Sequence, residues 1–316
     1  MNKQLIIDEL KKVINGKDEI LEEILICFLS DGHIVMEDVP GTGKTTLAKA
    51  FSKAMGLDAH RMQFTSDVMP SDITGYLTYN VQKKENEYVL GPIFGCNIFL
   101  ADEINRASSK SQAALLEAME ERQSTISGKT IKVEDPFMVI GTMNPYVSPL
   151  FGISALPQSQ LDRFMLAIRM GYPTKADSIT MMKNREKIDP LSSINAVCSI
   201  DEIMKARQEI KEVHVNDDIY DYVWRLADAS RNHYKIETGM SPRTELSLIR
   251  LARTTAYLAG RNFVIPQDIR KYFKDAIIHK ITLKDDDNLQ IISKVRENVV
   301  SDILNNTQPP KLLVNK

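Results

Sequence analysis

A glycine-rich loop between an apolar run and a helical segment is the feature that most constrains this chain. Residues 33–36 read HIVM, which is typical of a short buried strand, and residues 44–55 have apolar side chains at helical spacing. The loop between them ends in Gly-Thr-Gly-Lys-Thr. A polyphosphate binds backbone N–H groups that point inward, and glycines followed by a helix N-terminus supply such groups. The sequence therefore predicts a strand–loop–helix unit that binds phosphate.

The residues of this loop have separate predicted roles. Lys44 can reach the β- and γ-phosphates of a nucleotide, and the Thr45 hydroxyl can bind Mg²⁺. The loop residues predicted to hold the nucleotide are Pro40, Gly41, Thr42, Gly43, Lys44, Thr45 and Thr46. Asp38 occupies the position where such a loop usually has its first glycine, but Asp tolerates unusual backbone angles better than most residues. Taken alone, the loop leaves open a second interpretation, a surface loop before an ordinary helix.

Two adjacent carboxylates follow the next apolar run. Residues 98–101 read IFLA, as expected for a central strand buried on both faces, and Asp102 and Glu103 come directly after it. Two carboxylates at the end of a buried strand are costly unless they meet a cation. We therefore assign Asp102 to the Mg²⁺ hydration shell and Glu103 to the base that activates water against the γ-phosphate. The alternative is a helix N-cap after an ordinary strand.

Two further residues are candidates for phosphate chemistry. Asn144 ends the next predicted strand, at the edge where open α/β sheets bind ligands, and it could orient the attacking water. An Asn-Pro turn is the alternative. Arg163 is a single cation beside an apolar anchor, and an arginine that neutralises charge on a transferring phosphoryl group raises the rate by ~10³–10⁵. A salt bridge from Arg163 to Asp162 or to nearby glutamates is the alternative.

The organisation of the chain predicts two domains. Short apolar runs alternate with helical patterns up to about residue 170 and helices dominate afterwards, which indicates a parallel sheet flanked by helices, followed by a smaller all-α domain. We place the boundary at Pro173, giving domains 1–172 and 173–316. Alternating residues predict β-hairpins within 76–90 and 125–133. Helices are predicted to start at Ser109, with Gln112 completing a capping box, and at Ser241-Pro242.

Composition argues against several classes of protein. The 40 Lys and Arg residues nearly balance the 42 Asp and Glu residues. The composition therefore gives no sign of the basic domain that a nucleic-acid-binding protein usually has, and we expect no nucleic-acid partner. The three cysteines have no metal-ligand spacing, and their odd count suits a reducing compartment. No apolar run approaches the ~20 residues of a membrane helix. The first residues lack the pattern of a signal peptide, so we expect no membrane segment and a cytoplasmic location.

Six stretches together resemble the AAA+ ATPases and, more narrowly, the MoxR family. They are EDVPGTGKTTLAKA, QFTSDVMPSDITGY, FLADEINRASSKSQAALLEAMEERQSTI, GTMNP, LPQSQLDRF and GMSPR, within residues 14–268. The resemblance implies an AAA+ P-loop NTPase core with a helical lid, ATP and Mg²⁺ as cofactors, and a homo-oligomeric, hexameric ring. It also implies that the two hairpins are the helix-2 insert and the pre-sensor hairpin.

The resemblance also implies roles for single residues. Asn144 looks like sensor 1, and Arg163 looks like the arginine finger given to a neighbouring subunit. Arg243 looks like sensor 2, an arginine of the lid that touches the γ-phosphate. The segment against which adenine packs is similar to Val13, Ile14 and Gly16.

The functional hypothesis is a ring-forming ATPase that remodels, assembles or matures protein clients. The resemblance implies a partner with a von Willebrand factor A domain and a role in inserting metal cofactors. A gas-vesicle ATPase or a metal-chelatase motor subunit is the alternative among enzymes. A nucleotide-gated scaffold with little hydrolysis is the alternative of another class, and Glu103 and Arg163 argue against it because a pure switch could lose both. A DNA helicase is disfavoured because no basic module accompanies the core.

Overall fold

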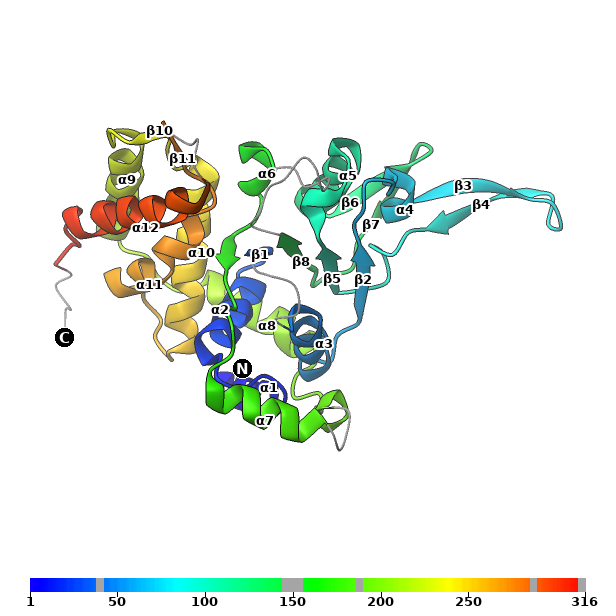
Figure 1. Cartoon of the computed structure of the whole chain (residues 1–316), viewed down its shortest axis with the longest axis horizontal. Helices are drawn as coiled ribbons and strands as arrows, with labels where there is room; N and C mark the ends of the chain where they lie inside the picture. The colour runs from blue at the N-terminus through cyan, green and yellow to red at the C-terminus, as the bar shows by residue number, and fades with distance from the viewer. Residues whose placement is uncertain (38–42, 144–155, 186–189, 285–288, 312–316) are drawn as a thin grey trace.

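The computed structural model describes residues 1–37, 43–143, 156–185, 190–284 and 289–311, and its centre is a five-stranded parallel sheet (Figure 1). The strand order across the sheet is β2-β5-β8-β1-β9. The strands are β1 (Ile34–Glu37), β2 (Ala59–Gln63), β5 (Ile98–Asp102), β8 (Met138–Met143) and β9 (Leu166–Ile168). The predicted parallel sheet flanked by helices is confirmed.

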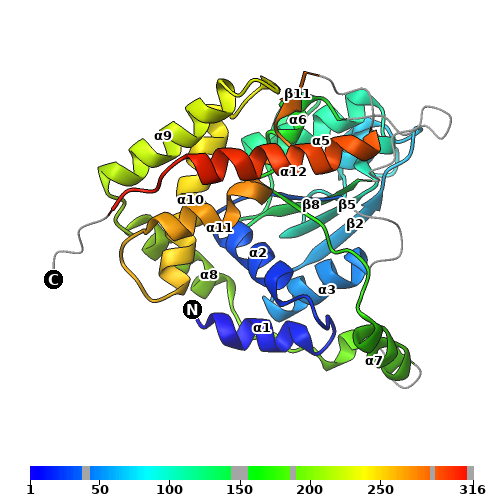
Figure 2. The same ribbon diagram turned by 60° about the vertical axis from the view of Figure 1, so that its left-hand side comes forward.

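Apolar residues alternate between the two faces of this sheet. In β5, Ile98 and Leu100 join one buried core, while Phe99 and Ala101 join a second core on the other face. The first core is covered by α1 (Lys3–Lys11), α2 (Asp18–Leu29) and α3 (Lys44–Ala54), and the second by α5 (Ser109–Glu121) (Figure 2). Both faces of the central strands are buried, which explains why these strands have continuous apolar sequences.

The start of α5 differs from the sequence prediction. The helix does begin at Ser109, but its N-cap is Ser108, whose hydroxyl accepts a hydrogen bond from the Ser111 backbone N–H. Gln112 is buried, and its amide donates to the carbonyl oxygens of Ile104 and Ala107 instead. The predicted capping box of Ser109 and Gln112 is thus wrong. A buried amide needs partners inside the fold, and the preceding turn supplies them.

Two antiparallel hairpins leave the core, as predicted. They are β3 (Gly75–Asn80) with β4 (Glu85–Leu90), and β6 (Gln123–Ile126) with β7 (Lys129–Lys132). Figure 1 shows β3 and β4 extending far from the sheet. The short helix α4 (Pro70–Thr74) leads into β3, where Gly75 has a φ of +98°. A Cβ atom on Gly75 would lie 2.1 Å from the Val89 carbonyl oxygen, so only glycine fits at the base of this hairpin.

Replacing Gly75 with alanine is expected to lower the free energy of unfolding by about 2–4 kcal/mol, because both the backbone angle and the contact with Val89 disfavour a side chain. Urea denaturation measures the loss. Gly128→Ala is the matched control, since Gly128 also has positive φ but open space around a built Cβ, and it should cost only about 1–2 kcal/mol. Equal losses in the two variants would contradict this account of Gly75.

Helices dominate the second half of the described chain. They are α6 (Gln158–Leu161), α7 (Lys175–Arg185), α8 (Ile200–Lys211), α9 (Asp217–Arg231), α10 (Pro242–Leu258), α11 (Pro266–Ile277) and α12 (Leu289–Asn306), with a small hairpin of β10 (Ile236–Thr238) and β11 (Thr282–Leu283). The predicted start of α10 is confirmed, because Ser241 caps it and Pro242 is its first residue. The domain boundary at residue 173 stays a prediction. Among the described residues, no helix is long and apolar enough to cross a membrane.

Candidate active site

The carboxyl edge of the sheet brings the predicted phosphate loop and the strand-end carboxylates together. Strands β1, β5 and β8 are neighbours and run in parallel, so Glu37, Asp102 and Met143 end at the same edge. The loop predicted to bind phosphate follows Glu37 directly. Asp38, Pro40, Gly41, Thr42 and Asn144 lie outside the described residues. Ligands of open α/β sheets bind at this edge.

The first turn of α3 has the properties of an anion site. Gly43 precedes the helix with a φ of +93°, and apart from its chain neighbours no described residue lies within 4 Å of a Cβ built on it. Lys44, Thr45 and Thr46 form the first turn and are half-buried. The first backbone N–H groups of a helix point outward from its N-terminus, which is the geometry in which helices bind phosphate.

Asp102 is held by two side chains that the sequence did not reveal. Thr142, on the neighbouring strand β8, donates its hydroxyl to Asp102 Oδ1 at 2.5 Å. Arg61, on β2, donates from Nη2 to Asp102 Oδ2 at 2.8 Å. The Thr142 hydroxyl also accepts from the Glu103 backbone N–H at 2.9 Å. Thr142 therefore positions both carboxylate residues, and the only signal in the sequence is a hydroxyl in the apolar strand 138–143.

Glu103 has an uncommon backbone conformation. Its φ of +57° and ψ of +48° lie in the left-handed region, which few residues other than glycine adopt. Its side chain is 25% exposed, and Oε2 accepts from Arg106 Nη1 at 2.9 Å. Strained residues of this kind cluster at functional sites, where the surrounding structure fixes their direction. The Thr142 hydrogen bond to the Glu103 backbone provides that fixation.

The donor set at this edge suits a magnesium ion held together with a nucleotide. Within the described ranges, no group of three or more His, Cys, Asp or Glu side chains could hold a metal by itself. Mg²⁺ is usually bound by one or two carboxylates together with phosphate oxygens and water. Asp102, with the Thr45 hydroxyl at the start of α3, fits that pattern.

A cavity of about 670 Å³ is lined in part by Glu37, the last residue of β1. Gly16, Glu37 and Ile168 line it, together with residues of α11, and its size is typical of small-molecule sites. Of the three residues predicted to contact adenine, only Gly16 lines the cavity, because Ile14 is buried in the core and Val13 packs against that core.

An acidic pair lines one side of this cavity. Glu23 on α2 and Asp275 on α11 both face it, and burial raises the pKa of the Glu23 carboxyl to about 8, with Asp275 and Glu19 acting in the same direction. Burial also raises the pKa of Asp275. At neutral pH the Glu23 carboxyl is therefore largely protonated and can donate a hydrogen bond.

Arg163 and Arg243 meet at a single carboxylate. Arg163 Nε donates to Glu120 Oε2 at 2.8 Å, and Arg243 Nη2 pairs with Glu120 Oε1. Arg243 Nη1 also lies 3.9 Å from Asp162 Oδ2. Asp162 accepts from the Ser241 hydroxyl at 2.8 Å, which ties the start of α10 to the segment before β9. The ion pair considered for Arg163 does form, and its partner is Glu120.

This arginine pair lies near the amino ends of the parallel strands, whereas the phosphate loop follows the carboxyl end of β1. Arg163 precedes β9, and the Met165 backbone N–H donates to the His33 carbonyl oxygen where β9 and β1 both begin. The phosphate loop instead follows the last residue of β1, Glu37. Strand β1 has four residues, so its amino and carboxyl ends are about 13 Å apart. Within one chain, the structure therefore does not bring Arg163 and Arg243 together with Lys44 and Glu103.

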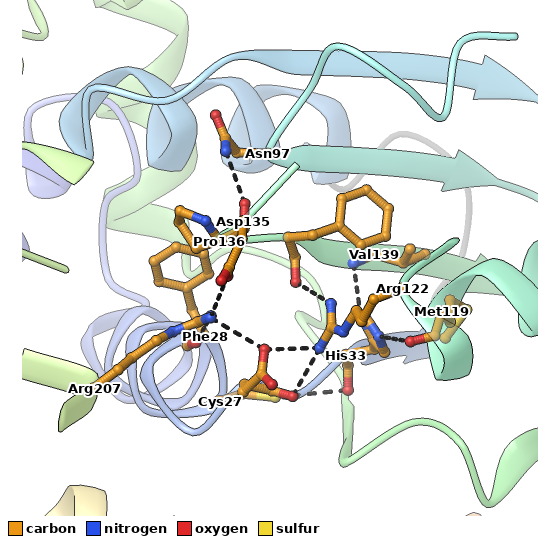
Figure 3. A network of polar contacts seen from close by, with 12 residues as sticks. Cys27, Phe28, His33, Asn97, Met119, Arg122, Asp135, Pro136, Val139 and Arg207 are labelled. Carbon is orange, nitrogen blue, oxygen red and sulfur yellow. Dashed lines mark hydrogen bonds and ion pairs between the residues drawn. The ribbon is translucent and has the colours of Figure 1, made fainter. Parts of the chain in front are cut away.

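A buried histidine fixes the end of α5 beside this pair. The Val139 backbone N–H donates to His33 Nδ1 at 2.9 Å, so His33 Nε2 carries the proton and donates to the Met119 carbonyl oxygen at 3.1 Å (Figure 3). Burial holds the pKa of His33 well below its usual value, which keeps the ring neutral. Met119 directly precedes Glu120, so this contact positions the carboxylate that both arginines share.

Two arginines brace the same edge from outside the pair. Arg122 Nη2 donates to Asp31 Oδ1 at 2.8 Å, and Arg207 Nη1 donates to the same oxygen at 3.1 Å (Figure 3). Arg207 is buried on α8 and also donates to the Phe28 carbonyl oxygen at 2.7 Å. These contacts join α2, α5 and α8, so the amino edge of the sheet forms a firm support for the arginine pair.

Comparison with known proteins identifies the class. Residues 33–166 match the family "ATPase family associated with various cellular activities (AAA)", and residues 228–301 match the AAA lid domain. The chain is 38% identical to the uncharacterized protein YeaC of Bacillus subtilis, over 96% of this chain and 93% of YeaC. It is 36% identical to chaperone MoxR1 of Mycobacterium tuberculosis, over 87% of this chain and 74% of MoxR1.

A solved structure supports the same assignment. The crystal structure of a candidate ATPase from Cytophaga hutchinsonii is similar with a TM-score of 0.88 and 33% identity, over 98% of this chain and 94% of that one. The fold and the site thus define an AAA+ ATPase, with an α/β core followed by a helical lid. Within that class, the chain belongs to the MoxR family. Nucleotide binding follows from this membership.

Proposed function

We propose that this chain is a ring-forming ATPase that couples ATP binding and hydrolysis to the remodelling of protein clients. The observation that carries the proposal is the convergence of Asp102, Glu103 and the first turn of α3 at one edge of the sheet. A positive helix end that binds phosphate, next to a carboxylate pair that meets a cation and a water, is the arrangement that phosphoryl transfer to water requires.

Each residue has a distinct task in this scheme. Lys44 and the N–H groups at the start of α3 would hold the β- and γ-phosphates, and Thr45 and Asp102 would hold Mg²⁺. Bound Mg²⁺ would offset the negative charge of the phosphates. Glu103 accepts the proton of the attacking water, and its backbone bond to Thr142 keeps its direction fixed. Asn144 is proposed to orient that water.

The arginine pair supports catalysis between protomers. Because Arg163 and Arg243 lie near the beginning of β1 and β9, whereas the phosphate loop follows the last residue of β1, we propose that both serve the nucleotide of a neighbouring protomer. Their shared contact with Glu120 places the two guanidinium groups close enough to bind one phosphate group together. The arginine finger and sensor 2 thus act on the same nucleotide, which requires an oligomer, proposed to be a hexameric ring.

The projecting hairpin is the proposed contact with protein clients. Tyr76, Tyr79 and Val81 on or next to β3 are 50%, 58% and 77% exposed. Exposed apolar groups on an extended hairpin suit a protein partner. A von Willebrand factor A domain partner and a role in metal-cofactor insertion rest on the resemblance to the family. A cytoplasmic location is proposed from the cysteines, whose number and spacing suit a reducing compartment. The gas-vesicle and chelatase-type motors share the same chemistry and remain alternatives to this task.

Replacing Lys44 with alanine tests the nucleotide site. We expect ATP affinity to fall about 100-fold, because the charge-assisted contacts to two phosphates are lost. Equilibrium titration with a fluorescent ATP analogue measures the change. Lys49→Ala is the matched control, since Lys49 is exposed on the same helix, and it should bind normally. Unchanged binding in Lys44→Ala would remove the phosphate role of this loop, and absent hydrolysis by the unmodified protein would favour the scaffold alternative.

A further inference from the structure

The Glu120 carboxylate holds two like charges close together. One oxygen faces Arg163, from the segment before β9, and the other faces Arg243, from the first turn of α10. Two guanidinium groups repel each other unless an anion lies between them. Glu120 therefore occupies the position, relative to both arginines, that a phosphate group would take.

The location of Glu120 in its helix argues that the charge is not there to stabilise α5. Glu120 lies in the last turn, next to the negative end of the helix dipole, and that turn contains no basic residue. A carboxylate is disfavoured at this end of a helix. Its favourable partners are instead the two arginines, which lie 43 and 123 residues away in the sequence.

Both ion pairs are accessible enough to be exchanged. The side chains of Arg163, Arg243 and Glu120 are 30%, 42% and 34% exposed, so each pair contributes little and a competing anion can replace it. A terminal phosphate group carries more charge than a carboxylate and has three terminal oxygens, whereas Glu120 offers only one oxygen to each arginine. Asp162 differs, because the Ser241 hydroxyl holds it in place at the start of α10.

The surrounding cavity has room and charge for such an exchange. It measures about 470 Å³, and its lining includes four arginines and three acidic residues. The acidic residues are Asp31, Glu120 and Asp162. The arginines are Arg122, Arg163, Arg243 and Arg250. Arg243 and Arg250 lie seven residues apart and therefore on the same face of α10. Removing the Glu120 charge would leave this cavity markedly more positive.

We propose that Glu120 is a competing anion that holds Arg163 and Arg243 within one protomer and yields them to the nucleotide phosphate of a neighbouring protomer. This inference rests on the proposed function, because it needs the arginines to act between protomers. Glu120 thus competes with the nucleotide phosphate of the neighbouring protomer for both arginines. Its neutralisation should favour productive contact between protomers, which is opposite in sign to the loss of either arginine.

Complementation between two variants tests this proposal. The acceptor carries Arg163→Ala and keeps its own Glu103, whereas the donor carries Glu103→Gln and keeps its arginines. ATP hydrolysis is measured at a fixed acceptor concentration while the donor is titrated. Donors that also carry Glu120→Gln should reach half-maximal rescue at about tenfold lower concentration, because two exposed ion pairs no longer compete. Donors with Glu120→Ala should shift in the same direction.

A matched control separates this effect from a general change of charge. Glu121→Gln alters the same charge on the adjacent, exposed residue and should leave the half-maximal donor concentration unchanged. An unchanged or higher half-maximal concentration for Glu120→Gln donors, or a lower plateau, would overturn the proposal for Glu120 alone. If donors with native Glu120 rescue nothing, the arginines do not act between protomers, and the proposed function fails together with this inference.

Discussion

Replacing Glu103 with glutamine is expected to lower kcat for ATP hydrolysis by about 10²- to 10⁴-fold while ATP still binds. Glutamine keeps the size of the side chain but cannot accept the proton of the attacking water. The hydrogen bond from the Glu103 backbone N–H to Thr142 involves no side-chain atom of Glu103, so the local structure should persist. Steady-state phosphate release measures kcat, and equilibrium titration of a fluorescent ATP analogue measures binding.

The control for this variant is Glu121→Gln, an equal change of charge on an exposed residue at the end of α5. It should hydrolyse ATP at the native rate. Native turnover in Glu103→Gln would show that another group activates the water. Loss of ATP binding together with turnover would indicate that Glu103 supports the structure of the site rather than the chemical step.

Replacing Arg163 with alanine is expected to lower kcat by about 10³- to 10⁵-fold in a preparation that contains only this variant. The reason is that charge developing on the transferred phosphoryl group loses its guanidinium partner. Arg243→Ala should also lower kcat, because Arg243 shares the Glu120 carboxylate with Arg163 and is proposed to serve the same nucleotide. Arg163→Lys should remain slow, since an ammonium group cannot form the two parallel hydrogen bonds of a guanidinium.

The control for the arginine variants is Arg225→Ala. Arg225 pairs with Asp221 on the exposed side of α9, away from both edges of the sheet. Its loss should leave kcat unchanged. A normal rate in Arg163→Ala would leave Arg163 with only the structural role of an ion pair to Glu120.

Local sequence patterns predicted the elements whose residues are consecutive in the chain. The apolar strands, the two hairpins and the start of α10 all follow from spacing within a few residues. Asp102 and Glu103 could be recognised because they follow a buried strand directly. The capping pattern at Ser109 failed because Gln112 is buried and its amide meets carbonyl groups that only the folded turn brings near.

Contacts between distant segments could not be predicted from the sequence. Thr142 meets Asp102 because of the register between β5 and β8, and Arg61 meets it because β2 lies on the other side of β5. Glu120 was recognisable only as a charged residue of a helix. Its significance depends on Arg163 and Arg243 reaching it from two other segments, and no local pattern encodes that meeting.

The most direct test of the central claim is the ATPase rate of a mixture of Arg163→Ala and Glu103→Gln protomers. Each variant alone should be nearly inactive, for different reasons. If the active site is shared between protomers, the mixture should hydrolyse ATP, because Glu103→Gln protomers supply Arg163 to neighbours that retain the base. A mixture no more active than the sum of its two components would contradict a catalytic site built from two protomers.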